Sequence, residues 1–385
     1  MEENLKIGSV LLERIGIDRT VVAGFRIVEI DFEKLKQHHN VSIEKEGKFT
    51  YLLNNGEFCK LEIKDHVMFG VLRAGVKRLK GVKQDYATMD IMIGNAEQGN
   101  LQNQTVLEYH EKLIQVFWYL YEEYGVLIDA TLLKFKELEV NCTFKIKEEF
   151  HKYHRPLRLL MFNLPKTYKK LGQVQAINEE EKRLETETFW RGNGSIEVKI
   201  YNKQRQLEET GKVVAAGNIM RIEFKFKTTA KIKGVLKSAS VWDLTDEKII
   251  RLYRREFQRA FEKKYNSWKK SNGKELRNKV IQHKQKAIRY WQSNLLRECS
   301  NMEQITQVPV LLDVNDLMIQ IKKLETGGHF SRVRAGILKQ CSYNDVFLQN
   351  DSAKVEEIFN AVAKSCDESL KRIEIGETPL HGEVA

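Results

Sequence analysis

The chain has 385 residues, of which 42% are hydrophobic, 30% charged and only 4 proline, a composition that excludes collagen-like and largely disordered proteins. This length predicts two or three domains, and the formal net charge of +11 indicates an acidic partner. The sequence has no run of 18 apolar residues, so no membrane span is predicted. The first 20 residues are charged and do not resemble a secretory signal. The five scattered cysteines form no CxxC motif or zinc knuckle, which is typical of a cytoplasmic protein.

Short strands are predicted first. Residues 49–53 and 57–63 flank an Asn-Asn-Gly turn, and residues 87–94 form a further candidate strand. Residues 105–124 change to a helical period. The apolar side chains that repeat there are Val106, Tyr109, Leu113, Val116, Phe117, Leu120 and Tyr124. We expect this aromatic stripe to belong to the core.

Four alternating runs follow, at residues 132–144, 158–163, 195–203 and 218–227, and each predicts a strand. Alternation places successive side chains on opposite faces. One face of these strands is therefore apolar. The other face is polar and carries Glu137, Glu139, Asn141, Thr143, Glu197, Lys199, Tyr201, Lys203, Arg221, Glu223, Lys225 and Lys227.

From residue 244 the pattern is helical, with Asp243 or Thr245 as the expected N-cap. Further helices are predicted at 274–298, 313–324 and 352–373, with loops at Pro309 and at residues 327–328. The predicted fold class is α+β: antiparallel sheets flanked by helices, followed by an all-helical, basic C-terminal region. The predicted divisions are 1–100, an N-terminal part of the core; 101–240, the catalytic sheet; and 241–385, the helical region.

The positive charge is concentrated in one segment. Residues 251–300 hold fifteen Lys or Arg against four Glu, a net charge of +11 that equals the charge of the whole chain. Such a segment is suited to a nucleic-acid backbone. A solvated helix surface is an equally good reading, and an anionic membrane surface is a weaker one. Trp268, Trp291 and nearby tyrosines could stack on single strands or anchor helices on one another.

The polar strand faces together offer carboxylates, a phenol and several cations. Carboxylates can hold a divalent metal that polarises a phosphate, and cations stabilise the charge that develops during reaction. A tyrosine can act as the nucleophile and retain a cut strand covalently. These are the groups that phosphodiester cleavage needs. Spacing alone does not place the three strands side by side.

Two segments carry a resemblance to a known family. The run Gly-Ser-Ile-Glu-Val-Lys-Ile-Tyr-Asn-Lys at 194–203 and the run Asn-Ile-Met-Arg-Ile-Glu-Phe at 218–224 resemble the Tyr-x-Lys and Arg-x-Glu strands of rolling-circle replication initiators. The gene II/X replication proteins of phages and plasmids, the trans-acting plasmid initiators and related relaxases share this pattern. Glu139 matches an acidic residue on an earlier strand. The resemblance covers about residues 130–260.

This resemblance implies a metal-dependent enzyme that nicks and closes DNA. The implied catalytic residues are Tyr201, Lys203 and Arg221. The implied ligands of Mg or Mn are Glu139, Glu223 and Glu208. The residues expected to bind nucleic acid are Lys199, Arg254, Arg255, Lys263 and Lys264. The expected partners are origin DNA, both as duplex and as single strand, and a second copy of the chain. A host helicase is also expected, because the chain has no GxxxxGK[ST] loop with which to bind ATP.

One position departs from the family pattern. The Glu expected five residues after the motif tyrosine is Gln206 here, so either Glu208 replaces it or the site is inactive. The alternatives are therefore a non-catalytic, sequence-specific DNA-binding protein and a relaxase for conjugative mobilisation. Tyr168 lies in a basic stretch and is interpreted as solvated. His38, His39, His151 and His154 have the wrong spacing for metal ligands on one strand and are interpreted as surface or loop residues.

Overall fold

The computed structural model describes residues 15–44, 49–52, 58–65, 70–79, 82–92, 103–162, 164, 168, 170–178, 183–209, 217–263, 265–266 and 349–375. The chain divides into two compact units. The first comprises residues 1–148, 167–256 and 360–385, and the second comprises residues 149–166 and 257–359. The candidate catalytic residues all belong to the first unit.

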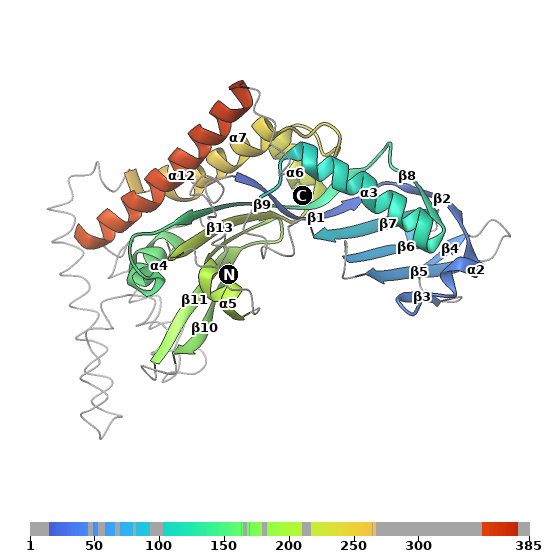
Figure 1. Ribbon diagram of the computed structural model, residues 1–385, viewed down its shortest axis with the longest axis horizontal. Coiled ribbons are helices and arrows are strands. Elements are labelled where there is room, and N and C mark those ends of the chain that lie inside the picture. Colours follow the sequence, from blue (N-terminus) through green and yellow to red (C-terminus); the bar gives the residue numbers. More distant parts are fainter. Residues whose placement is uncertain are drawn as a thin grey trace, which may run out of the picture. The chain divides into compact units, whose positions relative to one another are not determined.

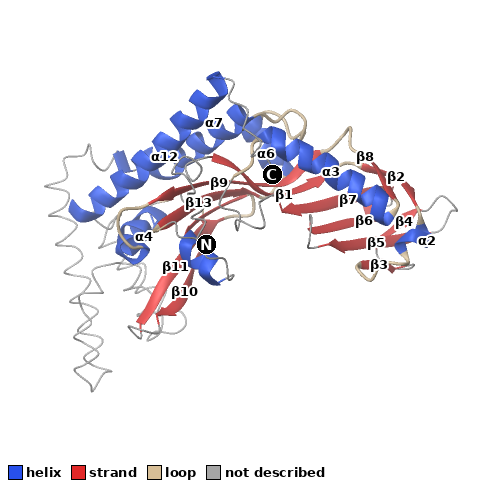
Figure 2. Ribbon diagram, viewed as in Figure 1, coloured by secondary structure: helices blue, strands red, loops and turns tan. Residues whose placement is uncertain are grey.

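The first unit is built on a large antiparallel sheet (Figures 1 and 2). The strands of this eleven-stranded sheet run in the order β10-β11-β12-β13-β9-β1-β7-β6-β4-β5-β3. Their bounds are β1 Ile15–Ala23, β3 Val41–Glu44, β4 Phe49–Leu52, β5 Phe58–Asp65, β6 Gly70–Leu79, β7 Val82–Met92, β9 Lys134–Lys145, β10 Lys170–Asn178, β11 Arg183–Gly192, β12 Ile196–Asn202 and β13 Ile219–Phe226. Strands β2 (Arg26–Ile30) and β8 (Val126–Asp129) form a separate pair.

Helices of this unit cover the apolar face of the sheet. Those that pack on this face are α3 Val106–Tyr124, α6 Thr229–Leu236 and α7 Asp246–Phe257, and the unit also contains α2 Phe32–Leu35 and α5 Lys203–Glu209. On α3, the Tyr109 ring stacks on Phe135 and its hydroxyl lies 3.1 Å from the Thr20 hydroxyl. On α7, the Tyr253 ring packs edge-on against Phe224 and its hydroxyl donates to the Ile222 carbonyl. These helices leave the opposite face for polar side chains, as in many antiparallel sheets.

The sequence of α3 sets where this helix begins and ends. Thr105 is the N-cap and forms a capping box with Glu108. Gly125 ends the helix with φ of +66°, a conformation that favours glycine. Between them, Val106, Tyr109, Leu113, Val116, Leu120 and Tyr124 are buried, so the predicted core stripe is confirmed except at Phe117, which is half-buried.

The second unit has fewer described elements. They are η1 Phe150–Tyr153, α4 His154–Phe162, the π-helical segment Gln258–Glu262 that continues α7, and part of α12 (Gln349–Ile375). Within this unit, Tyr265 and Phe257 each pack edge-on against Phe359. The Tyr153 hydroxyl donates to Glu357 at 2.9 Å. Helix α12 confirms the helix predicted at 352–373.

Most predicted elements are present, and the α+β fold class is confirmed. Strands β4 and β5 pair as the predicted hairpin, and β7, β9, β12 and β13 cover the other predicted strands apart from one. Thr245 caps α7 through its hydroxyl, which accepts from the Lys248 amide. The helices predicted at 274–298 and 313–324, with Pro309 and residues 327–328, lie outside the described residues. The division into 1–100, 101–240 and 241–385 stays a prediction.

Two predictions are wrong. Residues 158–162 belong to helix α4 and not to a strand. The buried residues Leu157, Leu160, Met161 and Leu164 follow a helical spacing that a short apolar run conceals. Tyr168 is not solvated, because only 1% of it is exposed and its carbonyl accepts a hydrogen bond from Arg191.

No helix in the described part of the chain is both long enough and apolar enough to cross a membrane.

Candidate active site

The three polar strand faces lie side by side on the face of the sheet opposite α3, α6 and α7. Strand β13 pairs with β12 on one side and with β9 on the other. In this register Glu223 is opposite Lys199 on β12 and opposite Asn141 on β9. Directly opposite residues of an antiparallel pair have Cβ atoms about 5 Å apart. The register therefore gathers side chains that are more than eighty positions apart in the sequence.

Three carboxylates meet at the centre of this face. Asp18, Glu139 and Glu223 each offer an oxygen, and these oxygens lie within 4.8 Å of one another. Glu139 and Glu223 are only 6% and 4% exposed. Two ligands of one cation at 2.0–2.6 Å can be at most about 5 Å apart. The predicted convergence of Glu139 with Glu223 is thus confirmed, and the spacing suits one divalent cation.

Asp18 reaches this cluster because β1 is irregular. Ile17 pairs with Val140 and Thr20 pairs with Leu138, so Asp18 and Arg19 together face the single residue Glu139. This is a β-bulge, a feature that re-aims side chains and is frequent beside active sites. The Arg19 guanidinium is held in turn by the Asp90 carboxylate on β7.

Tyr201 lies beside a buried arginine. Tyr201 on β12 is directly opposite Arg221 on β13, and the two side chains are hydrogen-bonded. The Arg221 side chain is fully buried; its Nε donates to the Thr143 hydroxyl at 2.7 Å and it contacts Asp18 at 3.3 Å. Arg221 therefore connects the phenol to the carboxylate cluster.

The environment of the phenol has two opposing effects on its pKa. Tyr201 is 8% exposed, and its burial raises the pKa of the phenol above the ordinary value of 10. The positive charge of Arg221 and its hydrogen bond lower that pKa but do not offset burial. The net effect is a phenol that is harder to ionise than a tyrosine in water.

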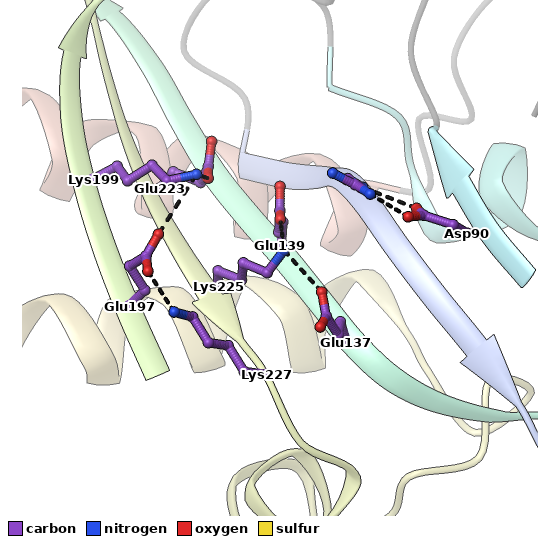
Figure 3. A network of polar contacts seen from close by, with 9 residues as sticks. Asp90, Glu137, Glu139, Glu197, Lys199, Glu223, Lys225 and Lys227 are labelled. Carbon is purple, nitrogen blue, oxygen red and sulfur yellow. Dashed lines mark hydrogen bonds and ion pairs between the residues drawn. The ribbon is translucent and has the colours of Figure 1, made fainter. Parts of the chain in front are cut away.

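Two lysines accompany the carboxylates (Figure 3). Lys199 contacts Glu223 at 3.2 Å and Glu197 at 3.7 Å. Lys225 contacts Glu139 at 2.7 Å and Glu137 at 2.8 Å. Farther along the same face, Lys227 pairs with Glu197. Each of these lysines can exchange a carboxylate partner for a phosphate, since both are anionic oxygen acceptors.

Not every residue expected in the site joins the cluster. Lys203 begins α5, directly after β12, and its amine donates to Gln206 at 2.9 Å. Glu208 lies exposed on α5, where it accepts a hydrogen bond from Gln204, and it is not a member of the carboxylate group. The third carboxylate of the group is Asp18, and the role of Glu208 as a ligand stays a prediction.

The basic residues expected to bind DNA lie elsewhere. Arg254 and Arg255 are on α7, which packs on the apolar face of the sheet, away from the carboxylates. Arg254 pairs with Asp367, and Arg255 donates to the Val235 carbonyl. Lys263 is exposed, and Lys264 lies outside the described residues. Their role in nucleic-acid binding stays a prediction.

The donor set favours a hard cation. Asp18, Glu139 and Glu223 supply only carboxylate oxygens to this group, with no sulfur or imidazole. Carboxylate oxygens are the ligands that Mg²⁺ and Mn²⁺ prefer. The residues present therefore fit such an ion. Beside it would lie a phenol, a buried guanidinium and two lysines, a set that can bind a phosphodiester and stabilise negative charge on it.

Comparisons with known proteins give distant similarities. No protein-family model and no curated protein matches the chain. Among solved structures, a rolling circle replication initiator protein from Geobacillus stearothermophilus is 15% identical, with 64% of this chain and 85% of that chain covered and a TM-score of 0.32. The di-domain ARO/CYC BexL of the BE-7585A biosynthetic pathway is 8% identical, with 65% and 95% covered and a TM-score of 0.16. Similarities at this level carry no argument about function.

Proposed function

We propose that this protein is an initiator of rolling-circle DNA replication that nicks one DNA strand at its origin through Tyr201. The observation that carries the proposal is the arrangement of one phenol, one buried guanidinium and three carboxylates on a single face of the sheet. The residue patterns at 194–203 and 218–224 support the same family of reactions.

In the proposed reaction the Tyr201 oxygen bonds to the phosphorus and the bond from phosphorus to the 3′ oxygen breaks. The phenol loses its proton and the 3′ oxygen gains one, so the products are a tyrosyl-linked 5′ end and a free 3′ hydroxyl. A Mg²⁺ or Mn²⁺ ion held by Asp18, Glu139 and Glu223 supplies charge neutralisation at the phosphate. Arg221 orients the phenol, and Lys199 holds a phosphate oxygen. Because one ester replaces another, the step needs no ATP.

The direct test uses supercoiled plasmid DNA that carries the cognate replication origin. We expect the protein with Mn²⁺ or Mg²⁺ to convert this DNA to open circles. We also expect it to remain attached to the 5′ end after denaturation. Failure of both products at saturating protein, with DNA binding intact, would contradict a nicking function.

The second candidate is a non-catalytic, sequence-specific DNA-binding protein. Gln206 at the position of a family carboxylate and the burial of Tyr201 favour it. A relaxase for conjugative mobilisation would use the same chemistry as an initiator. Loading of a separate helicase at the nick, or strand transfer to a recipient, would distinguish these two roles. A homodimer stays a prediction.

The basic segment 251–300 is expected to supply DNA affinity and little of the chemistry. Replacing Lys263, Lys264, Lys269 and Lys270 by Gln should flatten the log–log salt dependence of duplex binding by about 0.9 for each lysine that contacts a phosphate. Nicking at saturating protein should change much less, because the proposed catalytic groups precede residue 240. Binding titrations between 50 and 200 mM salt, a range over which about 10³–10⁵ in affinity is commonly lost, measure this slope.

The matched control replaces four lysines outside the segment, Lys36, Lys233, Lys237 and Lys371, all of which are exposed. This control makes the same change in net charge. Equal slopes for the two variants would show that the basic segment is a solvated surface with no particular part in DNA binding.

A further inference from the structure

Asn141 is a buried amide without a partner beside the carboxylate cluster. None of its surface is exposed, and neither its side-chain oxygen nor its nitrogen has a hydrogen-bond partner. Most buried polar side chains are hydrogen-bonded, because losing water without a replacement partner is costly. An asparagine in this state requires an explanation.

The register places this amide on the same face as the cluster. Asn141 follows Glu139 by two positions on β9, so both side chains point to the same side of the sheet. On β13 it is directly opposite Glu223. Its neighbours on this face are thus two of the three carboxylates, and the other face of β9 is the apolar one.

The surroundings explain why water is excluded there. On β1, Gly16 is opposite Asn141. A Cβ on Gly16 would lie 2.5 Å from the Asn103 Cβ and 2.8 Å from the Gln104 carbonyl oxygen, so residues 103–104 occupy the space above this glycine. The Asn103 side chain also donates to the Asn141 backbone carbonyl at 3.3 Å. Segment 103–104 therefore covers the strand beside Asn141.

We propose that the side-chain oxygen of Asn141 is a fourth protein ligand of the cation held by Asp18, Glu139 and Glu223. An amide oxygen is an ordinary ligand of hard cations, and it adds coordination without adding negative charge. That matters in a cluster where three carboxylates already repel one another. The inference rests on the metal site of the proposed function, but it does not require that the protein nicks DNA.

The test is a titration of the DNA-free protein with Mn²⁺. Binding is measured by calorimetry and by the paramagnetic resonance signal of Mn²⁺. Asn141→Leu keeps the approximate shape and removes both polar atoms. We expect it to weaken Mn²⁺ binding about 10- to 100-fold, the range seen when supporting groups of metal sites are removed. Asn141→Asp restores an oxygen and should bind Mn²⁺ far better than Asn141→Leu. Glu223→Gln serves as the control that disrupts the cluster itself.

Thermal unfolding in EDTA separates a ligand from a structural residue. With the cation removed, Asn141→Leu should unfold at the same temperature as the natural protein or at a higher one, because it replaces an unpaired buried amide by an apolar group. A lower unfolding temperature in EDTA would show that the amide serves the fold and would overturn the proposal. Unchanged Mn²⁺ affinity in Asn141→Leu, with affinity lost in Glu223→Gln, would also overturn it and leave the carboxylate site intact.

If Mn²⁺ binds as expected but no DNA is nicked, the proposed function fails and the ligand assignment stands.

Discussion

Tyr201→Phe is expected to abolish the covalent protein–DNA adduct and to lower nicking by at least about 10³-fold, the scale of effect that follows removal of a nucleophile. The substitution removes only the phenol oxygen, so the lysines can still contact phosphate. DNA affinity should therefore be unchanged. Arg221 keeps Thr143 and Asp18 as partners, and the lost hydrogen bond should cost only about 1 kcal/mol of stability. Labelled origin DNA analysed under denaturing conditions measures the adduct.

Tyr253→Phe is the matched control. Tyr253 is a fully buried phenol on the apolar side of the sheet, where its ring packs against Phe224 of β13 and its hydroxyl donates to the Ile222 carbonyl. Its variant should form the adduct at the normal rate once folding is confirmed. If Tyr201→Phe still yields an adduct, the nucleophile is another tyrosine, and peptide mapping of the adduct would identify it.

The strands that carry the candidate site could be predicted because most of their length alternates regularly. In β9 from Leu138 onward, and in β12 and β13, every second residue is apolar, so the polar positions of each strand share a face. Their adjacency could not be predicted, since the segments between them follow no pairing rule that is readable from spacing. The order β12-β13-β9 is what turns three ordinary amphipathic strands into one cluster.

Asp18 was missed for a specific reason. Ile15 and Ile17 begin an alternating pattern, which continues out of phase at Thr20 and Val22, and the break falls at Asp18 and Arg19. That interruption is the sequence signal of the bulge, and it could have drawn attention to Asp18. Asn141 was noted only as a member of a polar face, because burial without a partner becomes visible only when the neighbouring strands and segment 103–104 are in place.

The metal-free protein should lose stability as the pH rises from about 5 to 8, and Glu223 is the cause. Burial and the neighbouring Glu139 raise the pKa of Glu223 from 4.5 to about 7, against the opposing effect of Lys199. Between these values the folded protein retains a proton that the unfolded chain has released. The stabilising contribution is therefore fully present below the unfolded pKa and is lost as the pH rises through the folded one. At about 1.4 kcal/mol per unit, the effect is on the order of 3 kcal/mol.

Glu223→Gln should remove this pH dependence, because glutamine does not titrate. The measurement is the free energy of unfolding by denaturant, in EDTA, at several pH values between 5 and 8. Glu137→Gln is the control: Glu137 also pairs with Lys225 on this face, but its side chain is 29% exposed, so that variant should keep the dependence of the natural protein. Parallel profiles for the natural protein and Glu223→Gln would contradict the assignment.

A cation bound by Asp18, Glu139 and Glu223 should reverse the loss of stability that the metal-free protein shows as the pH rises. Binding requires the ionised carboxylate, so below pH 7 each cation that binds displaces the Glu223 proton, and Mn²⁺ affinity should rise up to about tenfold per pH unit until the carboxylate is ionised. The stabilisation that Mn²⁺ provides should grow over the same range, because it follows the affinity at fixed concentration. One proton and one divalent cation thus compete for the buried Glu223 carboxylate. The DNA nicking proposed for Tyr201 should therefore decrease at low pH over the same range in which Mn²⁺ affinity decreases.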